Sequence, residues 1–261
     1  MKILKLPAVL LVLALVSVIA FTGCLYTVVG SGNLVSKDWD YSGFTVVDAG
    51  SAFEVEVSQA SAYSVTITAD DNVLDYIKVI KSGDAVKIRM RSGIGYAGVT
   101  LRAEITMPDI RQVNLIGAAR CDLAGFTLSH DFKAELSGAT SLQLDDISAA
   151  NVAFDVSGAS NVSGVISASG HADFNISGAS QVELTGSADG LTADVSGASE
   201  LELAAFPVSG ASVDVSGVSR VTINTNGTLD GTLEGASQLL YIGNPALGDL
   251  NVSGASTIGR K

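Results

Sequence analysis

Residues 156–201 read VSGASNVSGVISASGHADFNISGASQVELTGSADGLTADVSGASEL, and the motif Ser-Gly-Ala-Ser stands in them three times. Variants of this motif recur along the second half of the chain, each around a glycine. The eight glycines are Gly117, Gly138, Gly158, Gly178, Gly197, Gly217, Gly235 and Gly254. Their separations are 21, 20, 20, 19, 20, 18 and 19 residues. The chain therefore repeats a structural unit of about 20 residues.

Apolar residues occupy fixed places on both sides of each glycine. Those two before and four after it are apolar or cysteine in every copy, whereas those three after it are mostly polar. Alternation with a period of two indicates a half-buried strand. A unit of this length holds two or three short strands and has no room for a helix. Parallel stacking of such units, ~4.8 Å apart, makes a solenoid.

We therefore predict an all-β fold over residues 113–261, a parallel β-helix, or solenoid, with coils of about 20 residues. The general preference for right-handed crossovers between parallel strands predicts its hand. A glycine in each motif suits a corner that needs a positive φ angle. Cys121 falls in an apolar column, which predicts a small buried side chain rather than a reactive thiol.

The first half of the chain has β patterns without this repeat. We expect a β cap over residues 43–112, continuous with the coils, and a tether over residues 24–42. Strands are predicted over residues 44–49, 52–57, 63–68, 85–91 and 99–107. Asp70-Asp71-Asn72 is a capping sequence for a short helix over residues 73–77, and Ser82-Gly83-Asp84 predicts a hairpin turn.

The N-terminus has the features of an export signal. Lys2 and Lys5 precede an uncharged, mostly apolar run over residues 6–21, which is short for a membrane-spanning helix. The run ends Phe21-Thr22-Gly23-Cys24, which resembles the signal of bacterial lipoproteins. That resemblance implies removal of residues 1–23, acylation of Cys24, and a body held on a membrane outside the cytoplasm. Ordinary secretion after cleavage nearby and an uncleaved anchor are the alternatives.

Three segments carry a family resemblance. NVLDYIKVIKSGDAVKI (residues 72–88), LRAEITMPDIRQVNLIGAA (residues 101–119) and the repeated SGAS turns resemble the bacterial family of putative auto-transporter adhesins with a head GIN domain. The resemblance covers about residues 43–258. It implies an exported protein, often a lipoprotein, with a β-helical fold. It implies adhesion as the role and brings no catalytic residues.

Charge limits the classes of partner. The chain has 15 basic and 27 acidic residues, a net charge of -12, which argues against nucleic acid binding. Residues 113–261 hold 5 of the basic and 16 of the acidic residues, so the predicted solenoid is strongly acidic. A cation or a cationic partner suits this charge.

The candidate binding residues lie three before each corner glycine. That column is Asn114, Glu135, Asp155, Asn175, Asp194, Asp214, Thr232 and Asn251. Stacked carboxylate and amide oxygens suit Ca²⁺, and Asp155, Asp194 and Asp214 are the candidate ligands, with Asp194 and Asp214 at the centre. The alternative is a solvated polar ladder without a metal.

The sequence has no catalytic signature. Asp145-Asp146 is typical of a solvated turn, and neither His130 nor His171 lies in a known catalytic motif. We therefore expect no cofactor, and a non-catalytic adhesion, interaction or scaffold module anchored by lipid to the cell envelope. Cell-wall or extracellular glycans, or a second copy, are the expected partners. A carbohydrate-active enzyme, a Ca²⁺-dependent glycan binder and an envelope sensor or accessory acting through a partner protein are the alternatives.

Overall fold

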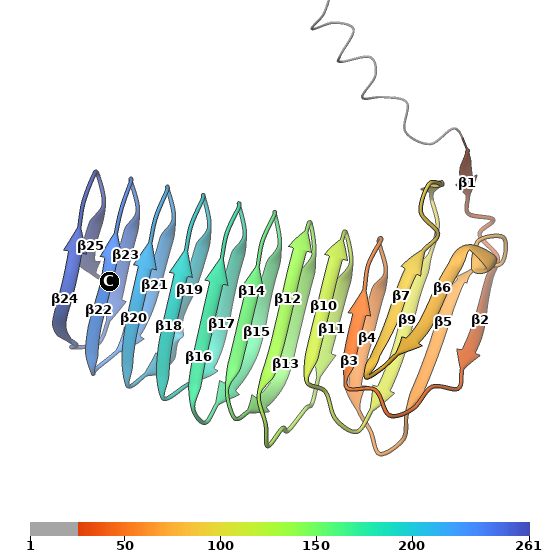
Figure 1. The fold of residues 1–261 in the computed structure, drawn as a ribbon, viewed down its shortest axis with the longest axis horizontal. Helices are drawn as coiled ribbons and strands as arrows, with labels where there is room; N and C mark the ends of the chain where they lie inside the picture. The colour runs from red at the N-terminus through yellow and green to blue at the C-terminus, as the bar shows by residue number, and fades with distance from the viewer. Residues whose placement is uncertain (1–25) are drawn as a thin grey trace, which may run out of the picture.

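The computed structural model describes residues 26–261, so the predicted signal over residues 1–23 and the predicted acylation site Cys24 lie outside the described residues. The described chain forms a flattened rod of strands, with the cap at one end and the C-terminus at the other (Figure 1). Within residues 26–261, no helix is long and apolar enough to span a membrane.

Two sheets run the length of the rod. Across residues 26–261, the first sheet has eleven strands in the order β24-β22-β20-β18-β16-β14-β12-β10-β3-β7-β6. Its strands are β3 (Val46–Ala49), β6 (Ile77–Ser82), β7 (Ala85–Met90), β10 (Gln112–Gly117), β12 (Phe132–Gly138), β14 (Val152–Val156), β16 (His171–Ile176), β18 (Gly190–Val195), β20 (Gly210–Val215), β22 (Thr228–Leu233) and β24 (Ala246–Val252).

The second sheet has twelve strands within the same described residues, in the order β2-β5-β9-β4-β11-β13-β15-β17-β19-β21-β23-β25. Its strands are β2 (Leu34–Trp39), β4 (Glu54–Gln59), β5 (Ser64–Asp70), β9 (Leu101–Met107), β11 (Arg120–Ala124), β13 (Ser141–Ala149), β15 (Asn161–Ala168), β17 (Gln181–Ser187), β19 (Glu200–Val208), β21 (Arg220–Thr225), β23 (Gln238–Ile242) and β25 (Thr257–Arg260). Outside both sheets, β1 (Thr27–Val29) pairs in parallel with β8 (Gly95–Ala97).

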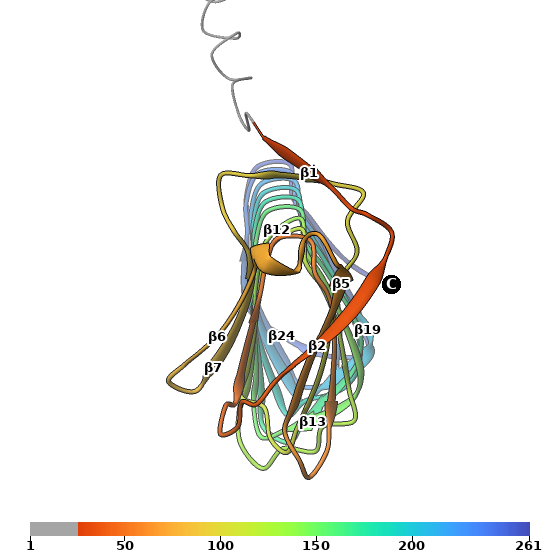
Figure 2. The same ribbon diagram turned by 90° about the vertical axis from the view of Figure 1, so that its right-hand side faces the viewer.

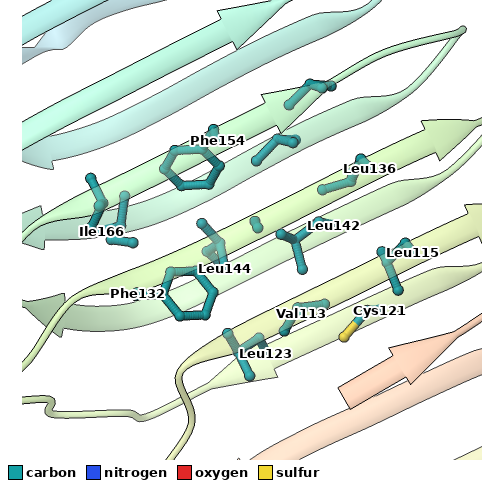
Figure 3. Packing of buried hydrophobic residues seen from close by; sticks show 14 of the residues in the cluster. Val113, Leu115, Cys121, Leu123, Phe132, Leu136, Leu142, Leu144, Phe154 and Ile166 are labelled. Carbon is teal, nitrogen blue, oxygen red and sulfur yellow. The ribbon is translucent and has the colours of Figure 1, made fainter. Parts of the chain in front are cut away.

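The predicted parallel solenoid of about 20-residue coils is confirmed, and each coil gives one strand to each sheet. Every strand from β10 to β25 pairs in parallel with the strand two places along the chain, as β14 does with β12 and β16. The alternating apolar residues point between the sheets, where Figure 3 shows Phe132, Phe154 and Leu142 packed in the core. Phe154 and Phe174 of successive coils stack with ring centroids 5.2 Å apart.

The corner glycines adopt the predicted positive φ angles, from 70° at Gly254 to 100° at Gly138. At each corner from Gly138 onward, the amide of the next residue donates to the glycine carbonyl one coil earlier, as Ala179 N does to Gly158 O at 2.7 Å. A buried serine or threonine stands two residues after most of these glycines. Within this column, the Thr140 hydroxyl donates to Ser160 Oγ at 2.9 Å. Cys121 is fully buried and free, as its column predicts.

The cap over residues 43–112 differs from the solenoid because its outer strands are antiparallel. The strand β5 pairs antiparallel with both β2 and β9, and β6 forms an antiparallel hairpin with β7. Figure 2 looks onto this end, where β2 crosses the stack and the β6–β7 hairpin extends away from it. The hairpin turn predicted at Ser82-Gly83-Asp84 joins β6 to β7.

Two expectations for the N-terminal part of the chain differ from the structure in detail. The predicted short helix over residues 73–77 is present as one 3₁₀ turn, η1 (Leu74–Tyr76). It has no side-chain cap, and the Asp70 carboxylate accepts from Gly32 N and Thr100 N instead. The predicted tether over residues 24–42 is not a free linker where it is described. It forms β1 and β2, and Trp39 and Tyr41 pack partly buried against the core.

Candidate functional site

The outer face of the eleven-stranded sheet carries the column that lies three residues before each corner glycine. Strand register places Glu135 beside Asp155, and Asp194 beside Asp214. Their chain neighbours fill the core, so these side chains point to solvent. The column is continuous from β10 to β24, with neighbours ~4.8 Å apart. We call the acids on this side of β12 to β24 the acidic face: Glu135, Asp155, Asp173, Asp194, Asp214, Asp230, Glu234 and Asp249.

Asp155 is engaged by a lysine of the preceding coil. The Lys133 Nζ lies 2.8 Å from Asp155 Oδ2 and 2.7 Å from Glu135 Oε1. Hydrogen bonds to Asp155 and Glu135 raise the pKa of the Lys133 ammonium, so the amine stays charged. This lysine neutralises much of the charge of its two partners. Asp155 is therefore poorly placed to hold a cation of its own.

Asp194 and Asp214 are the adjacent carboxylates that were predicted as the centre of a Ca²⁺ site. Asp214 Oδ1 accepts a hydrogen bond from Thr232 N at 2.9 Å. A shallow depression beside them is lined by Asp214, Ser216, Thr232 and Glu234. Within residues 26–261, no group of three or more His, Cys, Asp or Glu side chains lies close enough together to hold a metal ion. Asp194 and Asp214 face solvent on neighbouring coils, and the Ca²⁺ site stays a prediction.

The acidic face has no compensating cations over most of its length. The sequence contains no Lys or Arg between residues 134 and 219. Carboxylates on successive coils therefore face solvent with a single sign of charge. Such a surface attracts cations and cationic partners and repels anionic ones. Its side chains are short, so a partner can approach the sheet closely along several coils.

A groove of about 550 Å³ lies where the acidic face meets the cap. Asp48 of β3 and Arg89 of β7 form an ion pair at one end, and Arg89 Nη1 also donates to the Asp48 carbonyl at 2.9 Å. Asn114, Glu135 and Asn175 line the floor farther along the rod. The groove thus has both signs of charge, whereas the face beyond it is acidic.

The Asp48 end of the groove was missed by sequence reasoning, although a signal for it exists. Residues 47–55 read VDAGSAFEV, which aligns with VDVSGVSRV at residues 213–221. Asp48 then occupies the column position of Asp214, and Ser51 takes the place of the corner glycine. Register confirms this, because Asp48 pairs with Asn114. Ser51 adopts a φ of 65°, the conformation that glycine supplies in the other copies.

Of the other polar residues singled out in the sequence, Asp145, Asp146 and His130 lie apart from this face, whereas His171 lies on it, at the start of β16. Asp145 and Asp146 are exposed where the register of β13 shifts, and Asp146 has a φ of 53°. His130 Nε2 lies 2.7 Å from Asp109 Oδ1, where two turns meet at the edge of the rod. His171 Nε2 lies 2.9 Å from the Thr192 hydroxyl. The two histidines belong to different coils and contact different carboxylates, Asp109 and Asp173.

Solved structures with this fold cover nearly the whole chain. A putative adhesin from Parabacteroides distasonis ATCC 8503 matches with a TM-score of 0.78 at 16% identity, over 90% of this chain and 100% of that one. A putative lipid binding protein from the same strain matches with a TM-score of 0.73 at 16% identity, over 90% and 99%. A putative adhesin from Parabacteroides merdae ATCC 43184 matches with a TM-score of 0.71 at 18% identity, over 90% and 99%.

Comparison at the level of sequence identifies the family. Among curated proteins, the comparison found no significant match. A family model, described as putative auto-transporter adhesin, head GIN domain, matches residues 43–245, which include the cap and the repeated coils up to β23. The chain belongs to the family of putative auto-transporter adhesins with a head GIN domain.

Proposed function

We propose that this protein is an exported, lipid-anchored solenoid that serves as a non-catalytic adhesion or interaction module, with the acidic face as its contact surface. The partner class that fits is a cationic polymer, such as a glycan or peptidoglycan that carries free amino groups. The observation that carries this proposal is the run of carboxylates on successive coils, unpaired with Lys or Arg beyond Asp155.

Repetition supports binding to a polymer. Equivalent positions on the acidic face recur every ~4.8 Å along the rod, so a partner with its own repeat makes several equivalent contacts. Each contact between an exposed carboxylate and an amine contributes less than about 1 kcal/mol. Several such contacts on one rigid surface raise the total affinity through effective concentration.

The carboxylates in the groove beside the cap give less support to the alternative of a carbohydrate-active enzyme. Glycoside cleavage uses two carboxyl groups that flank one bond, about 5–10 Å apart, together with subsites that hold the sugar. The groove beside the cap does contain Glu135 and Asp155, but Lys133 bridges these two carboxylates. The Lys133 ammonium therefore stands between the two carboxylates, where the bond to be cleaved would have to lie.

Binding of the purified full chain in detergent to an array of glycans tests the proposal. The array includes neutral sugars, acidic sugars and amine-bearing sugars such as deacetylated glucosamine oligomers. Bound protein is measured once in buffer with Ca²⁺ and once in buffer with a chelator. We expect retention on the amine-bearing glycans, weakened by salt and indifferent to chelator. Binding that requires Ca²⁺ would instead favour the metal-dependent alternative.

Matched variants locate the contact. The double variant Asp194→Ala, Asp214→Ala removes two neighbouring carboxylates of the acidic face, and Glu183→Ala removes an exposed carboxylate of the opposite sheet. We expect roughly tenfold weaker binding for the double variant and little change for Glu183→Ala. Equal losses for both would contradict the acidic face as the contact surface.

A further inference from the structure

Exposed apolar side chains gather at the beginning of the described chain. Ten large hydrophobic residues are exposed within residues 26–261, and four of these lie between residues 26 and 35. The four are Tyr26, Val29, Leu34 and Val35, with exposed fractions of 60%, 63%, 49% and 38%. We call them the N-terminal apolar edge. Four such residues within ten positions of sequence are a local concentration of exposed apolar surface, of the kind that a membrane or a partner covers.

The N-terminal apolar edge lies close to the predicted acylation site in sequence. Leu25 is the single residue between Cys24 and Tyr26, and β1 begins at Thr27. Three residues of extended chain span at most about 11 Å. A lipid on Cys24 therefore brings β1 to within that distance of the membrane surface. In Figure 1, the chain leads into the rod through β1 at the capped end.

Hydrogen bonds from the segment before η1 fix this part of the chain to the cap. The buried Asp70 carboxylate accepts from Gly32 N at 2.6 Å and from Thr100 N at 2.7 Å. Asp71 accepts from the Ser31 hydroxyl at 2.6 Å, and Asn72 donates to the Val29 carbonyl at 2.8 Å. We call Asp70, Asp71 and Asn72 the N-terminal clamp.

The strand β1 is held on its other side by β8. Gly30 N donates to Ala97 O at 3.1 Å, and Gly95 N donates to the Tyr26 carbonyl at 3.0 Å. Val28 points inward and is buried, so alternation turns Val29 outward. Val29 is therefore presented by an ordered strand, and Leu34 and Val35 lie at the start of β2, which pairs with β5.

We infer that the N-terminal apolar edge rests on the bilayer interface, and that the N-terminal clamp couples the lipid anchor rigidly to the cap. This inference rests on the proposed lipid anchoring. Tyrosine favours the interface, because its ring is apolar and its hydroxyl stays hydrated. Buried Val and Leu side chains add hydrophobic stabilisation to that of the acyl chains. The rod then has a defined orientation relative to the membrane, unlike a domain that is tethered by a flexible linker.

Single-cysteine labelling tests the contact on the full chain. The protein has two cysteines, of which Cys24 is blocked when acylated and Cys121 is fully buried with a pKa raised by its burial. The variants Val29→Cys and Leu34→Cys each add one exposed thiol at the apolar edge. Val165→Cys is the matched control, because Val165 is 42% exposed on β15, far along the rod.

Each variant is labelled with an environment-sensitive fluorophore and reconstituted into phosphatidylethanolamine–phosphatidylglycerol vesicles that contain a headgroup nitroxide lipid. We expect about twofold or stronger quenching at positions 29 and 34 relative to position 165, together with a blue-shifted emission. Equal quenching at all three positions, in protein that floats with the vesicles, would overturn the inference.

A separate measurement keeps the two proposals distinguishable. The mass of the mature N-terminal peptide and flotation of the unlabelled protein report acylation directly. Acylated protein with equal quenching contradicts the contact alone and leaves lipid anchoring intact. A peptide without acyl groups, from protein that does not float, overturns the anchoring and with it the inference.

Discussion

At the scale of single residues, the corner glycines allow one coil to lie directly on the next. A Cβ atom on Gly178 would overlap the carbonyl oxygen of Gly158, and its φ of 83° is one that side chains disfavour. The same carbonyl accepts the amide of Ala179 at 2.7 Å, so the close approach is part of the coil-to-coil hydrogen bonding. The glycine is thus required twice, by its conformation and by its contact.

Substitution of Gly178 separates these two requirements when it is compared with Gly125. Gly125 also has a positive φ, 74°, but a Cβ there meets nothing within 4 Å. We expect Gly125→Ala to lower the free energy of unfolding by about 1–2 kcal/mol, the cost of the φ angle alone. Gly178→Ala adds overlap with backbone and is expected to cost about 3 kcal/mol or more. Urea unfolding measures both, and equal losses would contradict a packing role.

At the scale of elements, the antiparallel strands of the cap depend on side chains that local sequence rules assign elsewhere. Asp70 precedes η1 and has the sequence of a helix cap, yet its carboxylate bonds to Gly32 and Thr100, far away in the chain. These backbone amides lower the pKa of Asp70, because they stabilise the ionised carboxylate. The clamp ties the β1–β2 segment to β5 and β9, and it is therefore sensitive to acid.

The pH dependence of the clamp has a defined sign. A carboxyl group with a lowered folded pKa stabilises the folded state above its unfolded pKa of about 3.9 and loses that stabilisation as the pH falls through the folded value. Trp39 of β2, the only tryptophan in the sequence, reports on this region. We expect a change in its fluorescence with a midpoint below pH ~3.9, removed in Asp70→Asn and kept in Asp71→Asn. A midpoint near neutrality would contradict this assignment.

At the scale of the whole molecule, the two ends of the rod are unequal. Antiparallel strands cover the N-terminal end, whereas the coil of β24 and β25 has a neighbour on one side only within the described chain. The same motif position is fully buried at Val195 and 46% exposed at Val252. In a linear stack, each coil is stabilised mainly by its neighbours. The last described coil has one neighbour and therefore receives less stabilisation, so a substitution there costs less.

A pair of equivalent substitutions measures this inequality. Val195→Ala removes methyl groups from a filled core and is expected to cost about 2 kcal/mol. Val252→Ala occupies the same repeat position in the last coil and is expected to cost less than about 1 kcal/mol. Thermal unfolding of both variants gives the comparison, and similar losses would show that the last coil packs as tightly as the middle of the rod.

Local periodicity predicted the solenoid because the 20-residue repeat and the alternation of two can both be recognised within short stretches of the chain. Position in the repeat assigned burial to Cys121 and a positive φ to the glycines, and both assignments are confirmed. The first coil was missed because Ser51 stands where the other copies have glycine. The Lys133 bridge between Glu135 and Asp155 was missed because the lysine lies in another column and reaches Asp155 of the next coil through space.

The sequence by itself determined the repeat, the parallel stacking, the inward and outward sides of each strand and the acidity of the solenoid, because a 20-residue period and an alternation of two are local properties. Only the tertiary structure decided how the chain begins. The segment predicted as a tether became β1 and β2, held by Asp70, Asp71 and Asn72. Such contacts join residues about 40 positions apart, and no local pattern specifies which distant backbone amide a carboxylate will find.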